Sequence, residues 1–490
     1  MIKKINWQQV LIALIVFLFF INPVADYDLG WHLRYGQYFW QNGKFLWTNT
    51  FAYTMPLFKW INHSYLYDPF VYTFFKAFGF FGISLLGAGF IYLTMTILFK
   101  AVHALPVEKV LASFLLFYFG VDSLLESLRS RYPSFVLMAI LYLILSKYKK
   151  NEKVIYFLPL LFLIWVNVHG TFSVGLLFLG AFCIMQIINF FNNSKKLSSL
   201  LKLGLVGIAS IAVTYFNPFH FDSILQALEH ATSPYLTYIN EYSHLEIASE
   251  HGIAMLFYLV IILVALFIRK KREFYLEAIA LIPFVYLAFG AIRNIAIFMI
   301  FSIPLIIKLL HPLMEKVSLS KTFKTIFPLG LVAIFSALLL RFFGFNLYSY
   351  SWNSYCYFSS GCSVRAMEYL KANRLEGNGF TYYDWGGFLE WQAPEIKTFI
   401  DGRMHLWHDQ EHYIIRDYFD VLRVEGNWEK IFKDYNFTWV LVPPKAKIVE
   451  KLNGWVQDGT WEKVYEDARS LIYVRTNPPV QITSPTIPSQ

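Results

Sequence analysis

Nine residues near the N-terminus, D-Y-D-L-G-W-H-L-R at 26–34, combine side chains that acid–base and phosphate chemistry uses. Asp26 and Asp28 stand two residues apart, and His32 and Arg34 follow them. In extended backbone the two carboxylates point the same way and could share one divalent metal ion, Mg²⁺ or Mn²⁺, or one acidic proton. In a helical turn they would point apart. The alternative interpretation is an ordinary polar loop that ends a helix.

The segment before this cluster is apolar from Trp7 to Ala25, so the cluster begins where a membrane-spanning helix should end. No small-x-small cleavage site separates the two, and the segment is therefore predicted to be a retained helix and not a signal peptide. Hydrophobic residues make up 57% of the chain and charged residues 15%, which is typical of a mostly lipid-embedded protein. The net charge of +9 comes from short Lys and Arg clusters between apolar segments, which argues against nucleic-acid binding.

The apolar segments predict a polytopic α-helical membrane protein with about eleven transmembrane helices, because a bilayer requires roughly 20 apolar residues per span. The expected spans are 7–25, 80–99, 108–127, 132–147, 154–168, 171–191, 203–218, 253–268, 274–292, 295–310 and 326–344. The aromatic stretch 66–78 is interrupted by Asp68, Pro69 and Lys76, and it is predicted to be an interfacial helix.

Basic residues predict the orientation of these helices, because Lys and Arg are enriched in cytoplasmic loops. Clusters occupy every second connection: Lys3 and Lys4; Lys100; Lys147, Lys149, Lys150 and Lys153; Lys195, Lys196 and Lys202; Arg269 to Arg272; and Lys316, Lys321 and Lys324. The N-terminus is therefore predicted to be cytoplasmic. An odd number of spans places the region from about Phe345 onward outside the cytoplasm.

The remaining polar residues near helix ends gather on the opposite, external side. After 26–34 they are Asn62 and His63; Arg129 and Arg131; Asn167 and His169; Asn217, His220, Glu241, His244 and Glu246; and Arg293 and Asn294. Charged groups this close to hydrocarbon are costly and usually functional. A side chain that reaches from a helix end to water is the alternative for any single one. Their occurrence at five external ends favours a common site.

Residues 345–476 change character and predict a small extracytoplasmic (periplasmic) α/β domain with a mixed sheet, after a transmembrane domain at 1–344. Short strands are expected near Phe380–Tyr383, Thr398–Ile400, Thr438–Val442, 461–465 and 470–475, with helices at Val364–Asn373, 409–423, 427–435 and 444–453. The Pro-rich tail at 477–490 is expected to be disordered. Cys356 and Cys362 could form a disulfide or remain two free thiols.

Two motifs of this region each place an aspartate just after an expected strand. They are Y-Y-D-W-G-G-F at 382–388, with Asp384, and F-I-D-G-R at 399–403, with Asp401 and Arg403. Ligands of open α/β sheets bind at the carboxyl ends of strands, which favours a functional role. Asp turns with Gly at positive φ are the equally open alternative.

The order of these motifs resembles the GT-C glycosyltransferases and, more narrowly, a little-characterised group of bacterial envelope GT-C-like proteins. The similar stretches are D-Y-D-L-G-W-H-L-R-Y-G (26–36), W-I-N-H (60–63), R-S-R-Y-P-S-F (129–135), W-V-N-V-H-G (165–170), F-N-P-F-H (216–220), I-R-N-I (292–295), Y-D-W-G-G (383–387) and F-I-D-G-R (399–403). The resemblance implies transfer of a sugar from a polyprenyl-phosphate donor to an extracytoplasmic acceptor, at the bacterial cytoplasmic (inner) membrane. Gly30 stands where the group's pattern has an aromatic residue.

By this resemblance the role of the acidic base or metal ligand falls to Asp28, with Asp26 as its neighbour. Such a reaction also needs cations for the leaving phosphate, since guanidinium pairs with phosphate in a bidentate way. The candidates for donor phosphate binding are Arg34, Arg131, Arg293, His63 and His169. The candidates for acceptor contact or for support of the site are His32, Asn167, Glu241, His244, Asn294, Asp384, Asp401 and Arg403.

Three other functions compete with this hypothesis. A lipid-linked glycan ligase or polymerase shares the chemistry and uses a larger donor. A transporter or flippase would place charges near mid-membrane and show repeated halves, whereas here the polar groups gather on one side and no repeat is visible. A non-catalytic scaffold or sensor would not need carboxylates and arginines at five helix ends.

Overall fold

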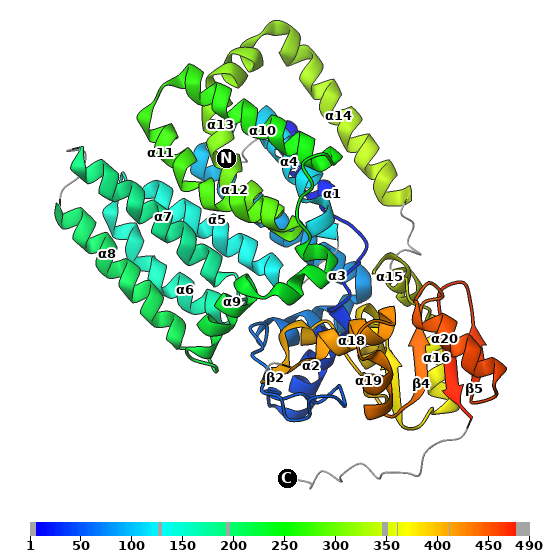
Figure 1. Cartoon of the computed structure of the whole chain (residues 1–490). Helices are drawn as coiled ribbons and strands as arrows, with labels where there is room; N and C mark the ends of the chain where they lie inside the picture. Colours follow the sequence, from blue (N-terminus) through cyan, green and yellow to red (C-terminus); the bar gives the residue numbers. More distant parts are fainter. Residues whose placement is uncertain are drawn as a thin grey trace. The chain divides into compact units, whose positions relative to one another are not determined.

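The computed structural model of the chain describes residues 6–125, 130–192, 197–344, 351–359, 361–410 and 412–476, so the tail predicted at 477–490 lies outside the described residues. The chain divides into two compact units (Figure 1). The first unit comprises Met1–Asp26, Tyr35–Phe45 and Ile61–Tyr355, and the second comprises Tyr27–Arg34, Leu46–Trp60 and Cys356–Gln490. Two pieces from near the N-terminus, one of which carries Asp28, therefore belong to the unit formed by the C-terminal region.

The first unit is built from helices, which Figure 1 colours from blue to yellow-green. The α-helices are α1 (Trp7–Phe19), α3 (Tyr67–Val102), α4 (Pro106–Leu125), α5 (Arg131–Lys147), α6 (Leu158–Val166), α7 (Phe172–Phe191), α8 (Leu197–Ala212), α9 (Asp222–Thr232), α10 (Glu250–Arg269), α11 (Arg272–Ala280), α12 (Ile282–Gly290), α13 (Ile295–Leu319) and α14 (Lys321–Gly344). Short 3₁₀ turns join them at η1 (Glu152–Phe157), η2 (Val213–Tyr215), η3 (Pro234–Tyr238), η4 (Asn240–Tyr242) and η5 (Ile292–Asn294). Helix α2 (Leu29–Asn42) begins in the second unit and ends in the first.

Every one of the eleven predicted spans coincides with helix in the structure. Among the described residues, seven helical segments are long and apolar enough to cross a membrane: Tyr67–Val102, Phe172–Phe191, Leu197–Tyr215, Glu250–Arg269, Arg272–Gly290, Ile292–Leu319 and Lys321–Gly344. The other four predicted spans correspond to α1, α4, α5 and the pair η1–α6, which do not meet this length and composition. The polytopic helical class is thus confirmed, and the number eleven stays a prediction.

Helix α3 is two helices in one run, with a break at Gly79. The backbone of Gly79 has φ 59° and ψ −156°, a conformation essentially restricted to glycine. The break separates 67–78 from 80–102 at the point where the sequence predicted an interfacial helix to end and a span to begin.

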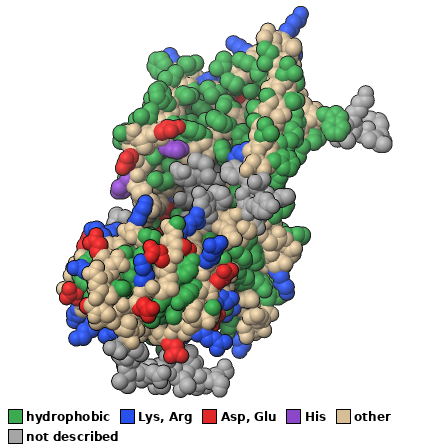
Figure 2. Space-filling view, turned by 90° about the vertical axis from the view of Figure 1, so that its right-hand side faces the viewer, with side chains coloured by type: hydrophobic (Ala, Val, Ile, Leu, Met, Phe, Trp, Pro, Cys, Tyr) green, Lys and Arg blue, Asp and Glu red, His purple; other side chains and the backbone are tan. Residues whose placement is uncertain are grey.

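Helix α13 is the centre of the first unit. Every residue from Ile295 to Ile307 is buried, and the helix packs against α3, α4, α5, α10 and α12. A helix that is apolar all round is suited to such a position. On the other helices large apolar side chains face outward, for example Leu201, Leu205 and Ile208 of α8. Figure 2 shows hydrophobic side chains covering the surface of this unit, as expected for contact with lipid.

The second unit is a small α/β structure around a four-stranded mixed sheet. The strand order is β1 (Asn378–Thr381), β4 (Phe437–Val442), β6 (Leu471–Arg475) and β5 (Trp461–Glu466); β1 pairs with β4 in parallel and the other pairs are antiparallel. Its helices are α15 (Trp352–Ser359, which begins in the first unit), α16 (Val364–Asn373), α17 (Gly386–Gln392), α18 (Ile414–Arg423), α19 (Trp428–Asp434) and α20 (Ile448–Gln457). The turns η7 (Tyr383–Trp385) and η8 (Met404–Leu406) and the hairpin β2 (His408–Asp409)–β3 (His412–Tyr413) complete it.

Two local predictions for this unit have clear outcomes. Cys356 and Cys362 form a disulfide. The strand predicted at Thr398–Ile400 is wrong, because Thr398 makes only a single bridge, to Ala52 of the 46–60 segment, and no ladder of pairs. The bridge is closed by Thr398 N, which donates to Phe51 O at 3.1 Å, and by Tyr53 N, which donates to Thr398 O at 3.0 Å.

Candidate active site

Asp28 lies against the turn of the F-I-D-G-R motif, within the second unit. Its side chain is buried, with 6% of the residue exposed. A Cβ atom added to Gly402 would overlap Oδ1 of Asp28 and lie 2.9 Å from its Cγ. Glycine between Asp401 and Arg403 thus leaves room for the carboxylate, which a side chain at this position would displace.

The glycines of the Y-D-W-G-G motif contact the same segment. A Cβ on Gly387 would lie 2.6 Å from Tyr27 O and 3.5 Å from Asp28 Cα. A Cβ on Gly30 would overlap Gly387 O. Gly30, the departure from the group's pattern, thus allows close backbone approach. Both motifs meet the segment that carries Asp28, and close approach explains their glycines better than positive φ does.

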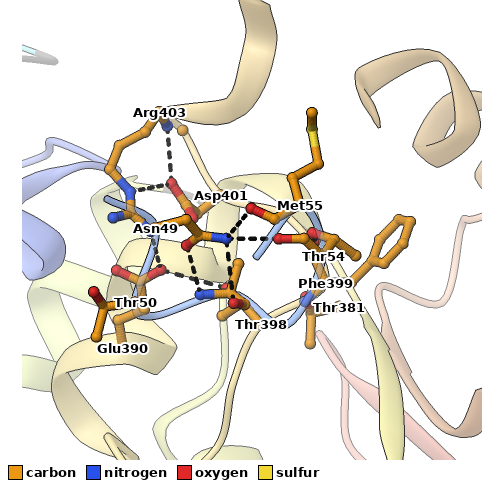
Figure 3. Close-up of polar contacts among 12 residues, drawn as sticks. Asn49, Thr50, Thr54, Met55, Thr381, Glu390, Thr398, Phe399, Asp401 and Arg403 are labelled. Carbon is orange, nitrogen blue, oxygen red and sulfur yellow. Dashed lines mark hydrogen bonds and ion pairs between the residues drawn. The ribbon is translucent and has the colours of Figure 1, made fainter. Parts of the chain in front are cut away.

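The F-I-D-G-R turn is fixed by a buried charge network, shown in Figure 3. Asp401 Oδ1 accepts from Arg403 N at 2.9 Å and from Nε at 2.7 Å, and Oδ2 accepts from Nη2 at 2.6 Å. Arg403 Nη2 also donates to Glu390 Oε1 at 2.9 Å. At most 1% of each of the three side chains is exposed. Such a bidentate pair in a dry environment fixes both position and direction.

The two carboxyl groups of this network differ in pKa. Burial raises the pKa of Glu390 well above its usual range, although Arg403 opposes the shift. Burial would also raise the pKa of Asp401, but the charge of Arg403 and its hydrogen bonds outweigh burial and lower it. Asp401 is therefore the carboxyl group whose ionised form the fold favours opposite Arg403, and Glu390 is the one whose protonated form it favours.

Aromatic rings surround the guanidinium of Arg403. Its Cζ lies over Trp60 at 5.3 Å, over Phe51 at 5.4 Å and over Trp407 at 5.6 Å. Two predicted site residues belong to the same group of rings. Arg34 Cζ lies over Phe51 at 5.8 Å, and the His32 ring lies 3.6 Å from that of Trp31, which packs edge-on against Trp60.

The segment 46–60 is held by the amide of Asn49, which Figure 3 places beside the charge network. Asn49 Nδ2 donates to the carbonyls of Ala52 at 3.3 Å, Thr54 at 2.6 Å and Met55 at 3.2 Å. Thr54 Oγ1 donates to Phe399 O at 2.5 Å. Met55 has positive φ, and the three bonds offset the strain of that backbone. The segment is thereby fastened to the strand-like stretch before Asp401.

Within the first unit, the segment that starts at Ile61 connects several of the predicted external residues. Asn62 Nδ2 donates to Asp68 Oδ2 at 2.8 Å, the hydroxyls of Ser64 and Ser130 lie 2.5 Å apart, and Tyr65 OH donates to Asn167 Oδ1 at 2.6 Å. Asn167 also donates to Leu163 O and Phe216 O, so its amide links three parts of the chain.

Asp26 and Arg131 are both buried in this unit, at 0% and 2% exposure. Both interact electrostatically with Tyr132, and Tyr355 OH donates to the backbone carbonyl of Asp26 at 2.6 Å. Two opposite charges near one ring, away from water, form the second polar centre of the molecule, since buried charges persist only when they are compensated.

The two predicted histidines adjoin the same segment. Gly170 lies against His63: an added Cβ would be 3.5 Å from His63 Cδ2. Burial lowers the pKa of His63 to about 4, so at neutral pH the imidazole is uncharged. It would meet a phosphate as a hydrogen-bonding group and not as a cation. His169 Nδ1 accepts from Thr171 N at 3.1 Å, which fixes its ring.

Arg293 forms an ion pair inside the first unit. Its Nη1 lies 3.0 Å from Glu241 Oε1, its Cζ lies 4.4 Å from the centre of the Tyr242 ring, and it donates to the Tyr242 hydroxyl. Two residues predicted for different ligands, donor phosphate and acceptor, are thus partners. His244 is exposed, and Asn294 Nδ2 donates to Leu287 O at 3.1 Å, which caps the end of α12.

The structure therefore gathers the predicted residues in several groups. Asp28, His32, Arg34, Asp401 and Arg403 lie in the second unit around the rings of Phe51 and Trp60, and Asp384 lies in η7 directly before Gly386 and Gly387. In the first unit, Asp26 and Arg131 lie near Tyr132, Glu241 pairs with Arg293, and His63, Asn167 and His169 adjoin the segment that starts at Ile61.

Sequence reasoning missed Glu390 and Asn49. A signal for Glu390 was available, because one carboxyl group among the apolar residues of G-F-L-E-W must find a buried partner. Among the residues that the structure describes, no three His, Cys, Asp or Glu side chains gather as a metal site would require. A divalent metal stays a prediction that would rest on carboxylates such as Asp28.

No family model matches the chain, and no curated protein matches its sequence. Solved structures do. The archaeal oligosaccharyltransferase AglB from Archaeoglobus fulgidus, in complex with an inhibitory peptide and a dolichol-phosphate, gives a TM-score of 0.62 at 11% identity, over 89% of this chain and 69% of AglB. ArnT from Cupriavidus metallidurans gives 0.51 at 12% identity in its apo state, over 96% of this chain and 97% of ArnT. Bound to undecaprenyl phosphate, ArnT gives 0.50 at 10% identity, over 96% and 98%.

Identities this low establish the fold alone, and both solved proteins are GT-C glycosyltransferases. The predicted fold class is confirmed by them and by the seven apolar helices. The chain is a multi-pass α-helical membrane protein with the GT-C fold, and a small α/β region follows its last long helix.

Proposed function

We propose that the protein is a membrane glycosyltransferase that moves a sugar from a polyprenyl-phosphate donor to an acceptor on the extracytoplasmic side. The observation that carries the proposal is Asp28, a buried carboxylate held by two glycine motifs in a chain with the GT-C fold. Solved structures of this fold hold a dolichol-phosphate in AglB and undecaprenyl phosphate in ArnT, which supports a lipid phosphate donor here.

In the proposed reaction the acidic residue acts on the acceptor hydroxyl, and the basic residues act on the leaving phosphate. Asp28 takes the proton of the acceptor hydroxyl while the acceptor oxygen bonds to the anomeric carbon, and the bond from that carbon to the phosphate oxygen breaks. The polyprenyl phosphate leaves with the electron pair and is stabilised by cations. Arg34, which belongs to the same unit as Asp28, is the candidate for this role, and Arg131 of the first unit stays a predicted phosphate-binding residue. Arg293, also in the first unit, could bind a phosphate only by exchanging its partner Glu241 for it. A Mg²⁺ or Mn²⁺ ion would be held by Asp28 and would supply further positive charge.

The N-terminus is proposed to be cytoplasmic and the second unit extracytoplasmic, in the inner membrane of a bacterium. A lipid-linked glycan ligase remains the second candidate, because the likeness to an oligosaccharyltransferase gives the higher TM-score. The transferase and the ligase differ in the size of the donor that they use.

The proposal is tested by donor consumption. The full chain in lipid nanodiscs is incubated with polyprenyl-phosphate monosaccharides or a lipid-linked oligosaccharide, and with a membrane extract of the source cells as the acceptor. Mass spectrometry follows the release of polyprenyl phosphate. Release from a monosaccharide donor supports the transferase, and release from the oligosaccharide donor alone supports the ligase. Passage of intact donor across the bilayer without release would identify a flippase. Turnover measured after treatment with EDTA, and again after addition of Mn²⁺, shows whether the reaction requires a divalent metal.

The first prediction concerns Asp28→Asn, which keeps the size and polarity of the side chain and removes its charge. If Asp28 is the base, turnover should fall about 10²–10⁴-fold, the usual weight of general base catalysis. Binding of undecaprenyl phosphate, measured on the same protein, should persist, whereas Arg131→Ala should weaken it. Asp409→Asn, at an exposed aspartate of the same unit, is the matched control. Full turnover in Asp28→Asn would remove Asp28 from the mechanism.

A further inference from the structure

We propose that Arg403, held by Asp401 and Glu390, positions the Asp28 carboxylate through the backbone of Gly402. The inference rests on the proposed function, because it concerns the position of Asp28 as the proposed base. Arg403 does not touch the reacting atoms in this scheme. It acts through a turn whose middle residue has no side chain and lies directly against Asp28.

The turn has few ways to move. Asp401 binds the backbone N–H and two guanidinium nitrogens of Arg403, which closes the turn on itself. The carbonyl of Gly402 accepts from Tyr383 OH at 3.2 Å. Four buried hydrogen bonds, counting that from Arg403 to Glu390, and the partly buried bond from Tyr383 thus fix the peptide groups on either side of Gly402. Glu390 Oε2 is buried without a hydrogen-bond partner, so the rigidity of the turn rests on the bonds among Asp401, Arg403 and Gly402.

Glu390 connects the turn to a second element. It lies on α17, whose first two residues are Gly386 and Gly387. Gly387 lies against the backbone of the Asp28 segment, at Tyr27 O and Asp28 Cα, while Gly402 bounds the carboxylate itself. The ion pair between Arg403 and Glu390 therefore links the turn that bounds the Asp28 carboxylate to the helix that contacts the Asp28 backbone.

The charge of the network suits this role. The charges of Asp401 and Arg403 cancel, and burial favours the protonated form of Glu390 by raising its pKa. The network is then neutral as a whole, so it fixes Asp28 in place without adding a negative charge beside it. An ionised Glu390 would repel both Asp28 and a donor phosphate.

The decisive experiment is a double-mutant cycle of Gly402→Ala and Asp28→Ala on the full chain in lipid nanodiscs. In the wild-type background the added methyl group should displace the carboxylate. Turnover should fall about 10²-fold, the effect expected of a 1 Å misplacement. The dissociation constant for undecaprenyl phosphate should change less than twofold. In the Asp28→Ala background the same methyl group has nothing to displace, so it should lower residual turnover no further.

Two further comparisons separate positioning from folding. Arg403→Lys keeps the charge but not the planar fork, and it should lower kcat with little effect on undecaprenyl phosphate binding. Glu390→Gln, which keeps an acceptor for Arg403, should retain more turnover than Glu390→Ala. Gly454→Ala, in α20 with no atom within 4 Å of the added Cβ, is the matched control for Gly402→Ala.

Melting temperatures test the contact between Gly402 and the Asp28 carboxylate in the absence of any donor. Gly402→Ala should lower the melting temperature, and Asp28→Ala should relieve that loss. Equal losses in both Asp28 backgrounds, in turnover or in melting temperature, would overturn the proposal, as would wild-type kcat in a folded Arg403→Lys variant. The proposed function fails differently: full turnover in Asp28→Asn would refute the base while the melting temperatures still reported on the contact.

Discussion

Glu390 shows how one buried residue can carry a pH dependence for the whole second unit. Its carboxyl group lies in a core with an arginine that is already neutralised, so the protonated form is the one that the fold stabilises. Below the pKa of the unfolded chain both states bind the proton, and the stabilisation is complete. As the pH rises above that value, the unfolded chain ionises and the folded chain does not, so stability is lost.

Glu390→Gln should remove that loss, because the amide resembles the protonated acid and does not titrate. As the pH rises above the usual pKa of a glutamate, we expect the melting temperature of wild type to fall more steeply than that of the variant, with the two closest at the acidic end. Glu395→Gln, at an exposed glutamate a few residues on, serves as the control. Parallel curves for wild type and Glu390→Gln would mean that Glu390 is ionised in the fold.

At the scale of the element, the break at Gly79 divides α3 into two helices. Residues before the break form one helix and those after it another, so a polar, aromatic stretch need not share the direction of an apolar span. The signal was visible in the sequence, since Asp68, Pro69 and Lys76 interrupt the pattern. The positive φ of Gly79 gives the break its physical cause.

Gly79→Ala should destabilise the protein by about 1–3 kcal/mol, the cost of holding a residue with a Cβ in this backbone region. Nothing lies within 4 Å of the added Cβ, so the effect is one of backbone conformation and not of packing. Gly89→Ala in the same helix also has open space but ordinary helical backbone, and should be neutral or slightly stabilising. Denaturation of both variants in one detergent measures the difference. Equal stability of the two would show that the break is not needed.

Elements were predictable from sequence where their signals are local. Apolar length gave the positions of the spans, and Val364–Asn373 is the helix that its periodicity predicted. Thr398–Ile400 failed because its backbone makes a single bridge to a loop from near the N-terminus and does not pair with a strand, although Phe399 is buried as in a strand. The contact of Asp28 with Gly402 could not be predicted either. A glycine indicates that another group approaches the backbone closely, but the sequence does not show which residue that is.

The whole molecule has one property that remains to be tested, its orientation. Alternating basic clusters predict that a periplasmic reporter such as alkaline phosphatase, fused after Thr476, is active, and that the same reporter inserted between Lys270 and Lys271 is inactive. The second site, in the turn between α10 and α11, is the internal control. A fusion at Thr476 that is active only as a cytoplasmic reporter would reverse the orientation and move the proposed acceptor to the other side.

The composition of the second unit has a consequence for how the protein is made. Its pieces 27–34 and 46–60 leave the ribosome early, but the residues they pack with begin at Cys356. At roughly 5–20 residues per second, these two pieces wait on the order of 15–60 s before their partners exist. During that interval the segment with Asp28 lacks the turn that bounds it, so a nascent chain cannot turn over donor. The proposed activity would therefore switch on only after synthesis has passed Arg403.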